Sequence, residues 1–174
     1  PWDCYGQLDL ATRQGNRIMR FSPFNTYAAK DGTVAIGAAT QVDWENLLEV
    51  MDRNHLKNDQ NYMNSSWRIS NNADVDAIVA NWTKSRPVAT IIEQCTEREI
   101  ACSPIREASD LMNWEHLQHR QLLTPTYHPD YPCIEGPLAA AFPLKFSDAN
   151  VGYNSPSAHL GEHNKSVMQA WLDE

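Results

Sequence analysis

Residues 24–43 read FNTYAAKDGTVAIGAATQVD, and this stretch contains a turn signal between two short runs that favour β-structure. Residues 26–29 and 33–38 flank the pair Asp31-Gly32. Such a pair is typical of a hairpin turn, because glycine tolerates the positive φ that tight hairpin turns use. The sequence therefore predicts a β-hairpin.

The same stretch ends in a helix start. Thr40 stands three residues before Asp43, so its hydroxyl can cap a helix whose first turn carries an acid. Apolar residues then recur at i, i+3, i+4 and i+7, which places them on one helical face. They are Trp44, Leu47, Leu48 and Met51. We predict a helix over residues 43–52, and the corner between strand and helix is where a binding site can form.

The remaining pattern predicts an α+β fold, because a hairpin is followed by helices and then by short runs broken by proline. Residues 54–66 are polar and indicate an irregular connection. Residues 100–105 indicate an edge strand or extended loop, since Pro104 lacks a backbone donor. Helices are predicted at residues 74–82, 87–97, 107–111, 113–122 and 165–172. Apolar residues alternate at Phe142, Leu144 and Phe146.

Composition limits the classes of function. The 174 residues are 42% hydrophobic and 21% charged, which is typical of a globular domain. The net charge of −8 argues against a nucleic-acid partner. Apolar runs are far shorter than a membrane span needs, and the four cysteines lack zinc or disulfide spacing, which favours a cytoplasmic protein. The chain does not start with methionine, so we expect a piece of a longer polypeptide.

Three local patterns suggest chemistry, each with a plainer alternative. Gly15 and Asn16 lie before Arg17, and such a loop can present N–H groups and positive charge to an anion, or be a solvated turn. Residues 159–163 match the zinc motif H-x-x-E-H, but Gly161 inside it costs a helix roughly 1 kcal/mol, which favours a loop entering a helix. Cys102 is a candidate nucleophile, although its apolar neighbours favour a small core residue.

A series of short motifs resembles the C-terminal part of family III CoA-transferases, which include formyl-CoA and carnitine CoA-transferases and α-methylacyl-CoA racemase. The motifs follow one another in the family's order from about Gly15 to the end. They are Ser22-Pro23-Phe24 to Tyr27, Lys30-Asp31-Gly32, Ala35-Ile36-Gly37, the Trp44 helix, residues 100–105, His116-Leu117 with Arg120, residues 143–147 and Leu160-Gly161-Glu162-His163.

The resemblance implies a domain organisation. Family members have a large Rossmann-like domain and a small domain, and two subunits interlink like rings. Residues 1–21 then correspond to a linker from the large domain, residues 22–119 to the small α+β domain, and residues 120–174 to a segment that returns to the large domain. The expected partners are the missing N-terminal half and a second subunit in a homodimer.

The resemblance also implies a reaction. In this family an aspartate takes the acyl group from a CoA thioester and then accepts CoA itself, which is covalent catalysis. That aspartate belongs to the half that has no counterpart here, so no catalytic residue is assigned. CoA is a substrate, and no cofactor or metal is expected. The family's glycine loop corresponds to residues 14–17, which are poorer in glycine than in formyl-CoA transferase.

The predicted substrate-binding residues are Gly15, Asn16, Arg17, Thr40 and Gln41. In this resemblance Thr40 takes the place at which the racemase branch has a glutamate acid/base group, and a threonine hydroxyl cannot act as an acid/base group near neutral pH. Transfer of CoA is therefore favoured over racemisation. The alternatives are a non-catalytic acyl-CoA-binding or partner-docking module, and a relative of the racemases.

Overall fold

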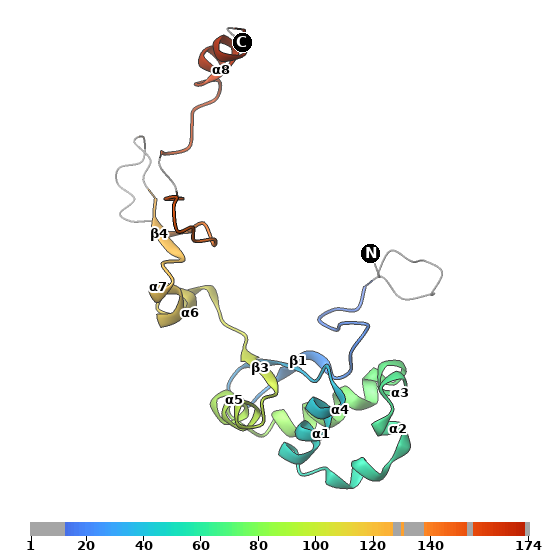
Figure 1. Ribbon diagram of the computed structural model, residues 1–174. Helices are drawn as coiled ribbons and strands as arrows, with labels where there is room; N and C mark the ends of the chain where they lie inside the picture. The colour runs from blue at the N-terminus through green and yellow to red at the C-terminus, as the bar shows by residue number, and fades with distance from the viewer. Residues whose placement is uncertain (1–12, 127–129, 131–137, 153–154, 173–174) are drawn as a thin grey trace. The chain divides into compact units, whose positions relative to one another are not determined.

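The computed structural model describes residues 13–126, 130, 138–152 and 155–172. It divides into two compact units, one ending at Ile105 and the other beginning at Arg106. Figure 1 shows the first unit in blue to yellow-green and the second in yellow to red. Helices and strands occur in both, which confirms the predicted α+β class. The predicted boundary between residues 119 and 120 falls within the second unit, and the domain assignment stays a prediction.

The first unit is built on a three-stranded antiparallel sheet. Its strands are β1 (Phe24–Ala28), β2 (Thr33–Gly37) and β3 (Ala101–Pro104), in that spatial order. The register places Ile36 of the central strand opposite Cys102 of β3. Because β3 is at the edge of the sheet, Pro104 interrupts no inner ladder, and the predicted edge strand is confirmed.

The predicted hairpin is confirmed, but the reason given for its glycine is wrong. Gly32 does not have a positive φ, and the turn is closed by the Ala29 N–H, which donates to the Gly32 carbonyl oxygen at 2.8 Å. Gly32 instead lies against α5 (Val88–Glu97), where an added Cβ would come within 3.1 Å of the Val88 Cγ2. Asp31 Oδ1 also accepts a hydrogen bond from the Val88 N–H at 2.7 Å, so the turn caps that helix.

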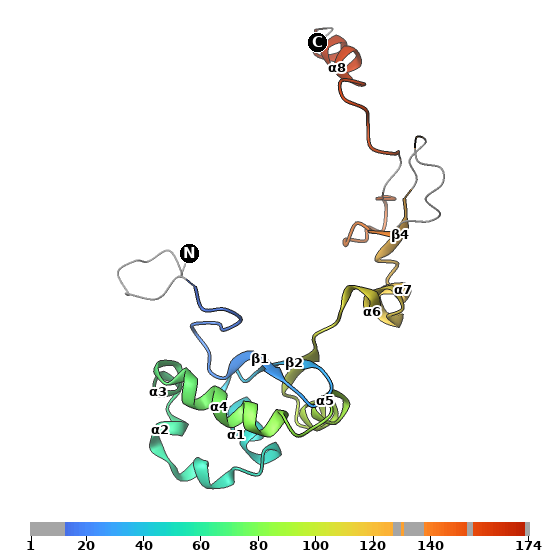
Figure 2. The same ribbon diagram turned by 180° about the vertical axis from the view of Figure 1, so that it is seen from behind.

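The core lies between the sheet and the helices α1 (Gln41–Val50), α4 (Asn72–Thr83) and α5. Figure 2 shows α4 and α1 beneath the β1–β2 hairpin. The predicted face of α1 is confirmed, because its four apolar side chains are all buried. The fully buried side chains include Val34, Ile36, Trp44, Leu47, Leu48, Val75, Val79 and Ile91.

The connection predicted to be irregular contains three short helices. They are the 3-10 helix η3 (Asn54–Asn58), α2 (Gln60–Met63) and α3 (Ser65–Ser70). Side chains cap two of them: Asp59 accepts from the backbone N–H of residue 61 at 2.9 Å, and Asn64 from that of residue 67 at 3.0 Å. The polar residues are thus helix starts. No apolar period was visible because none of these helices exceeds six residues.

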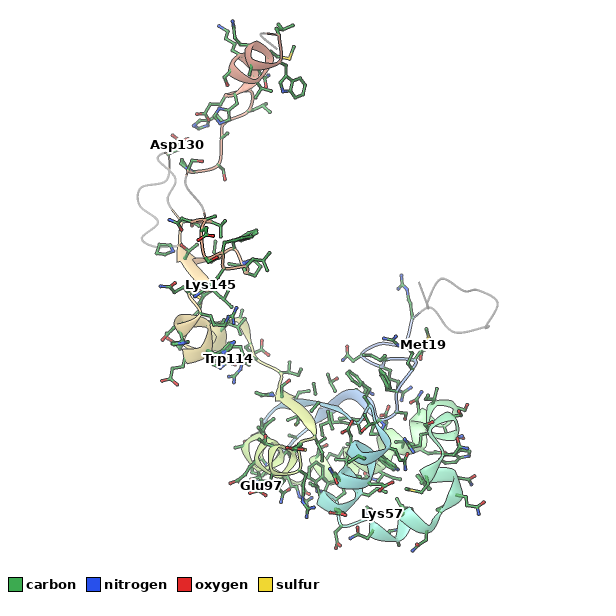
Figure 3. The ribbon with its side chains drawn as sticks, viewed as in Figure 1. Met19, Lys57, Glu97, Trp114, Asp130 and Lys145 are labelled. Atoms are coloured by element: carbon green, nitrogen blue, oxygen red, sulfur yellow. The ribbon has the colours of Figure 1, made fainter. Side chains whose placement is uncertain are left out.

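The second unit contains short helices and a two-stranded sheet. Its elements are α6 (Ala108–Met112), α7 (Glu115–His119), β4 (Leu123–Pro125), β5 (Leu138–Ala140) and α8 (Asn164–Leu172). The helix predicted at residues 113–122 is shorter than expected, and the alternating residues 142–146 form no strand. Figure 3 labels Trp114, whose ring centroid lies 4.3 Å from the Arg106 guanidinium carbon. No helix of the described residues is long and apolar enough to cross a bilayer.

Candidate functional site

The predicted anion-binding loop lies directly before β1. Gly15 has a φ of 65°, a left-handed conformation that glycine adopts without strain. The Asn16 Nδ2 donates a hydrogen bond to the Thr26 Oγ1 on β1 at 2.8 Å. The Arg17 Nε donates to the Asp76 Oδ2 on α4 at 2.7 Å. The loop is therefore tied to both the sheet and a helix.

Asp76 is the centre of this cluster, and it is only 8% exposed. Besides the bond from Arg17, its Oδ2 accepts from the Asn25 Nδ2 at 2.9 Å, and its Oδ1 accepts from the Tyr27 hydroxyl at 2.7 Å. Burial and the bond to Asp76 raise the pKa of Tyr27, so its hydroxyl stays protonated and donating. Three donors thus compensate the burial of one carboxylate.

Arg17 retains hydrogen-bonding capacity after this pairing. Its bond to Asp76 uses the Nε, and the two Nη groups have no partner among the described residues. The Arg17 side chain is 35% exposed, so solvent or a ligand can reach it. A guanidinium held at one edge can bind a carboxylate or phosphate with the other.

Thr40 and Gln41, the other predicted binding residues, lie at the corner between β2 and α1. The predicted helix cap at Thr40 is confirmed. The Thr40 Oγ1 accepts from the Asp43 N–H at 3.1 Å, and the Asp43 carboxylate accepts from the Thr40 N–H at 2.8 Å. The Gln41 amide has partners on both sides, and its Nε2 donates to Glu45 and to the Met63 sulfur. Its Oε1 accepts from Arg68 Nη1 at 3.2 Å. The Gln41 side chain therefore supports the corner, and both polar atoms of its amide are bonded within the protein.

Arg68, on α3, holds this corner from the inside and is 2% exposed. It donates to the Ser22 carbonyl oxygen at 3.0 Å and to the Tyr62 carbonyl oxygen at 2.8 Å. Its guanidinium carbon lies 5.3 Å from the Trp44 ring centroid. Burial lowers the pKa of Arg68, and the nearby Glu45 partly opposes that effect. These contacts fix the start of α1 relative to the chain entering β1.

Replacing Thr40 with alanine is expected to lower the free energy of unfolding by about 1 kcal/mol, because the helix loses a side-chain cap. Urea denaturation followed by circular dichroism measures the change. Thr40→Ser is the matched control, since serine keeps the hydroxyl and should unfold like the parent. Equal stabilities of the alanine and serine variants would contradict the role of the cap.

The two predicted groups of residues do not contact each other through any described hydrogen bond. Residues 15–17 are joined to β1 and α4, whereas residues 40–41 are joined to α3. Sequence reasoning missed Asp76 and Arg68. A signal for Asp76 existed: Asp76, Val79 and Thr83 recur at i, i+3 and i+7, and all three are buried. A charge on the apolar face of a helix indicates a buried partner.

The zinc-like motif does not form the helix that such a motif needs. Residues 160–163 lie in turns, Gly161 has a φ of 78°, and α8 begins at Asn164. The His159 N–H donates to the Glu162 Oε2 at 2.7 Å. The interpretation as a loop entering a helix is confirmed. In the described ranges no group of three or more His, Cys, Asp or Glu side chains is placed to hold a metal ion.

Cys102 packs against the core of the first unit, as predicted for a small apolar residue. Cys95, which is fully buried on α5, is the donor of the hydrogen bond between the two thiols, and Cys102 is the acceptor. That bond lowers the pKa of Cys102, and together with burial it raises the pKa of Cys95. The pair links β3 to α5.

The second unit carries a cavity of about 540 Å³ near the β4–β5 sheet. Its lining includes two cations and several apolar side chains. They include Arg120, Leu123, Phe142, Lys145 and Phe146, of which Lys145 is labelled in Figure 3.

The fold and the sequence define a class of protein. The structure is similar to a CaiB/BaiF family protein from Brucella suis, with a TM-score of 0.67 and 21% identity, over 91% of this chain and 40% of that one. The sequence matches CoA-transferase family III over residues 5–164. The chain belongs to CoA-transferase family III, which confirms the resemblance seen in its motifs.

Curated proteins that the chain is similar to include two CoA-transferases. The chain is 27% identical to a succinyl-CoA:mesaconate CoA-transferase of Haloarcula hispanica over 96% of its own length. It is 26% identical to the beta subunit of a succinyl-CoA–L-malate CoA-transferase of Chloroflexus aurantiacus over 92% of its length. In both comparisons it spans 40% of the relative.

Proposed function

We propose that this chain is the C-terminal part of a CoA-transferase that moves CoA between carboxylic acids. The match to CoA-transferase family III over residues 5–164 carries this proposal, and the relatives named above support it. The loop at Arg17 contributes to binding of the acid or acyl group, because the two Nη groups of the guanidinium, unpaired within the described part of the chain, can donate to an anion. The Gln41 amide is engaged within the protein, so the Thr40–Gln41 corner contributes through its shape and through the exposed Thr40 hydroxyl.

The reacting carboxylate is proposed to belong to an aspartate of a further polypeptide segment. That carboxylate attacks the thioester carbon, the C–S bond breaks, and CoA leaves as a thiolate. The thiolate then attacks the aspartyl carbonyl of the mixed anhydride, which releases the donor acid and leaves an aspartyl-CoA thioester. The acceptor acid takes over CoA by the reverse steps. Asp76 is unsuited to this role, because three hydrogen bonds hold it within the fold.

A transfer assay tests the proposal. The 174-residue protein is incubated with succinyl-CoA and mesaconate, alone and together with the preceding segment of its polypeptide. We expect mesaconyl-CoA in the second mixture and none in the first. Both mixtures lacking product, with the two segments shown to associate, would favour the alternative of a non-catalytic binding module. Exchange of an α-proton of a 2-methylacyl-CoA without CoA transfer would favour the racemase alternative.

The exposed apolar side chains of the second unit support association with another segment. Phe142, Leu144 and Phe146 are 48%, 58% and 54% exposed, and Trp171 on α8 is 73% exposed. Apolar side chains that are exposed together commonly mark an interaction surface. We propose that the rest of the transferase covers them, and that the assembled enzyme is a homodimer in the cytoplasm.

Replacing Trp171 with glutamate is expected to weaken binding of the further segment at least tenfold, since a charge would be buried without a partner. Isothermal titration calorimetry with the two purified segments measures the affinity. Ser166→Glu is the control, because it adds the same charge on the side of α8 away from Trp171. An affinity unchanged by Trp171→Glu would show that α8 does not take part in the contact.

A further inference from the structure

Asp76, which the sequence patterns had not singled out, sets the orientation of the Arg17 guanidinium. The Nε of Arg17 donates to the Asp76 Oδ2 at 2.7 Å, and this bond fixes one edge of a planar guanidinium. The opposite edge, formed by the two Nη groups, has no partner among the described residues. The side chain is 35% exposed, so solvent or a ligand can approach it.

The Asp76 carboxylate is held in one orientation by hydrogen bonds to both of its oxygens. Its Oδ1 accepts from the Tyr27 hydroxyl at 2.7 Å, and its Oδ2 also accepts from the Asn25 Nδ2 at 2.9 Å. The Asp76 side chain is 12% exposed, and it joins α4 to β1 within the core of the first unit. The loop that carries Arg17 is held a second time, through Asn16 and Thr26 at 2.8 Å. Arg17 is thus pre-oriented before any ligand arrives.

We propose that Asp76 is the positioning residue of Arg17, and that the positioned guanidinium binds the free carboxylate of a dicarboxylic acid. This inference rests on the proposed CoA transfer. A dicarboxylic substrate uses one carboxylate in the transfer and leaves the other in need of a partner. Two parallel N–H donors at one guanidinium edge match the two oxygens of that group. The relatives named above act on succinyl-CoA, mesaconate and L-malate, whose acids each have two carboxylates.

Binding to the 174-residue protein tests this without CoA chemistry. The NMR signals of the arginine Nε–H groups are followed while succinate, the neutral analogue succinamide or inorganic phosphate is added at low ionic strength, where charge pairing is least screened. We expect succinate to shift the Arg17 signal in a saturable way and succinamide to leave it unchanged. No shift with succinate, or saturable binding of phosphate alone, would overturn the assignment.

Variants separate positioning from a purely structural role. Arg17→Lys and Asp76→Asn should each weaken succinate binding about tenfold, whereas Asp76→Glu should restore part of the affinity. Arg13→Lys, in the same loop, is the matched control and should bind like the parent. Because Arg17 is partly exposed, Arg17→Lys should fold even where Asp76→Asn does not. Parental affinity in Arg17→Lys would overturn the proposal.

The assembled transferase provides an independent readout. In Asp76→Asn we expect the KM for succinate to rise about tenfold with little change in kcat. The preference for succinate over butyrate as acceptor should fall by a similar factor. An enzyme that transfers CoA with unchanged preference would refute the inference while leaving the proposed function intact. Absence of CoA transfer in the parent, with succinate still bound at Arg17, would refute the function alone.

Discussion

Trp44→Ala is expected to lower the free energy of unfolding by about 3–5 kcal/mol, the range for removing a large aromatic side chain from a core. Trp44 is fully buried, and its Nε1 donates to the Tyr62 carbonyl oxygen at 2.8 Å. The Arg68 guanidinium also loses its contact with the Trp44 ring, whose centroid lies 5.3 Å from the guanidinium carbon. Urea denaturation, followed by circular dichroism, measures the loss.

The matched control is Val42→Ala, two residues earlier on the same helix. Val42 is 64% exposed, so its truncation should change stability by no more than about 0.5 kcal/mol. Similar losses for Trp44→Ala and Val42→Ala would contradict the placement of the core on this face of α1.

Asp76→Ala is expected to cost about 3 kcal/mol, because a buried carboxylate with three donors is removed. The Tyr27 hydroxyl is then left in a buried position without its acceptor, and Arg17 loses its ion pair. The partial exposure of Arg17 limits the part that comes from the charge pair. The free energy of unfolding from urea denaturation is again the measured quantity.

Asp74→Ala is the control for this variant, since Asp74 is an exposed acid in the first turn of the same helix. Its loss should cost about 0.5 kcal/mol, the usual size of an exposed charge effect at a helix start. A cost for Asp76→Ala as small as that for Asp74→Ala would show that the Asp76 cluster does not stabilise the fold.

Local patterns predicted the parts of the fold that depend on local interactions. The hairpin around Asp31, the Thr40 cap and the buried face of α1 follow from spacing of a few residues, and each is confirmed. The interactions that stabilise these features lie within one turn or on one helical face, so the spacing of neighbouring residues is sufficient to predict them.

Other features depend on contacts between distant residues. Gly32 has no positive φ, and it lies close to Val88, 56 positions later in the chain, where a side chain at residue 32 would be crowded. Asp76 and Arg68 reach partners in the segment from Arg17 to Tyr27, more than 40 positions earlier. The helices between residues 54 and 70 are too short to show a helical repeat of apolar residues in the sequence. Of these contacts, only that of Asp76 leaves a local signal, because its charge lies on the buried face of α4.

The candidate site also contains a residue that a local pattern predicted and a residue whose contacts only the fold shows. Arg17 was predicted because a glycine and an asparagine precede it in a loop, and its Nη groups have no partner among the described residues. Gln41 was assigned by the family resemblance, and its amide is used by Glu45, Met63 and Arg68. Sequence identifies a residue that can bind an anion, whereas only the fold shows which donors are already occupied.

The position of the covalent intermediate tests most directly whether this chain shapes a site whose reactive carboxylate lies elsewhere. The assembled enzyme is incubated with succinyl-CoA, trapped with hydroxylamine and digested for mass spectrometry. We predict a hydroxamate on an aspartate outside these 174 residues. A hydroxamate on an aspartate or glutamate within them, or CoA transfer by this chain alone, would contradict the account.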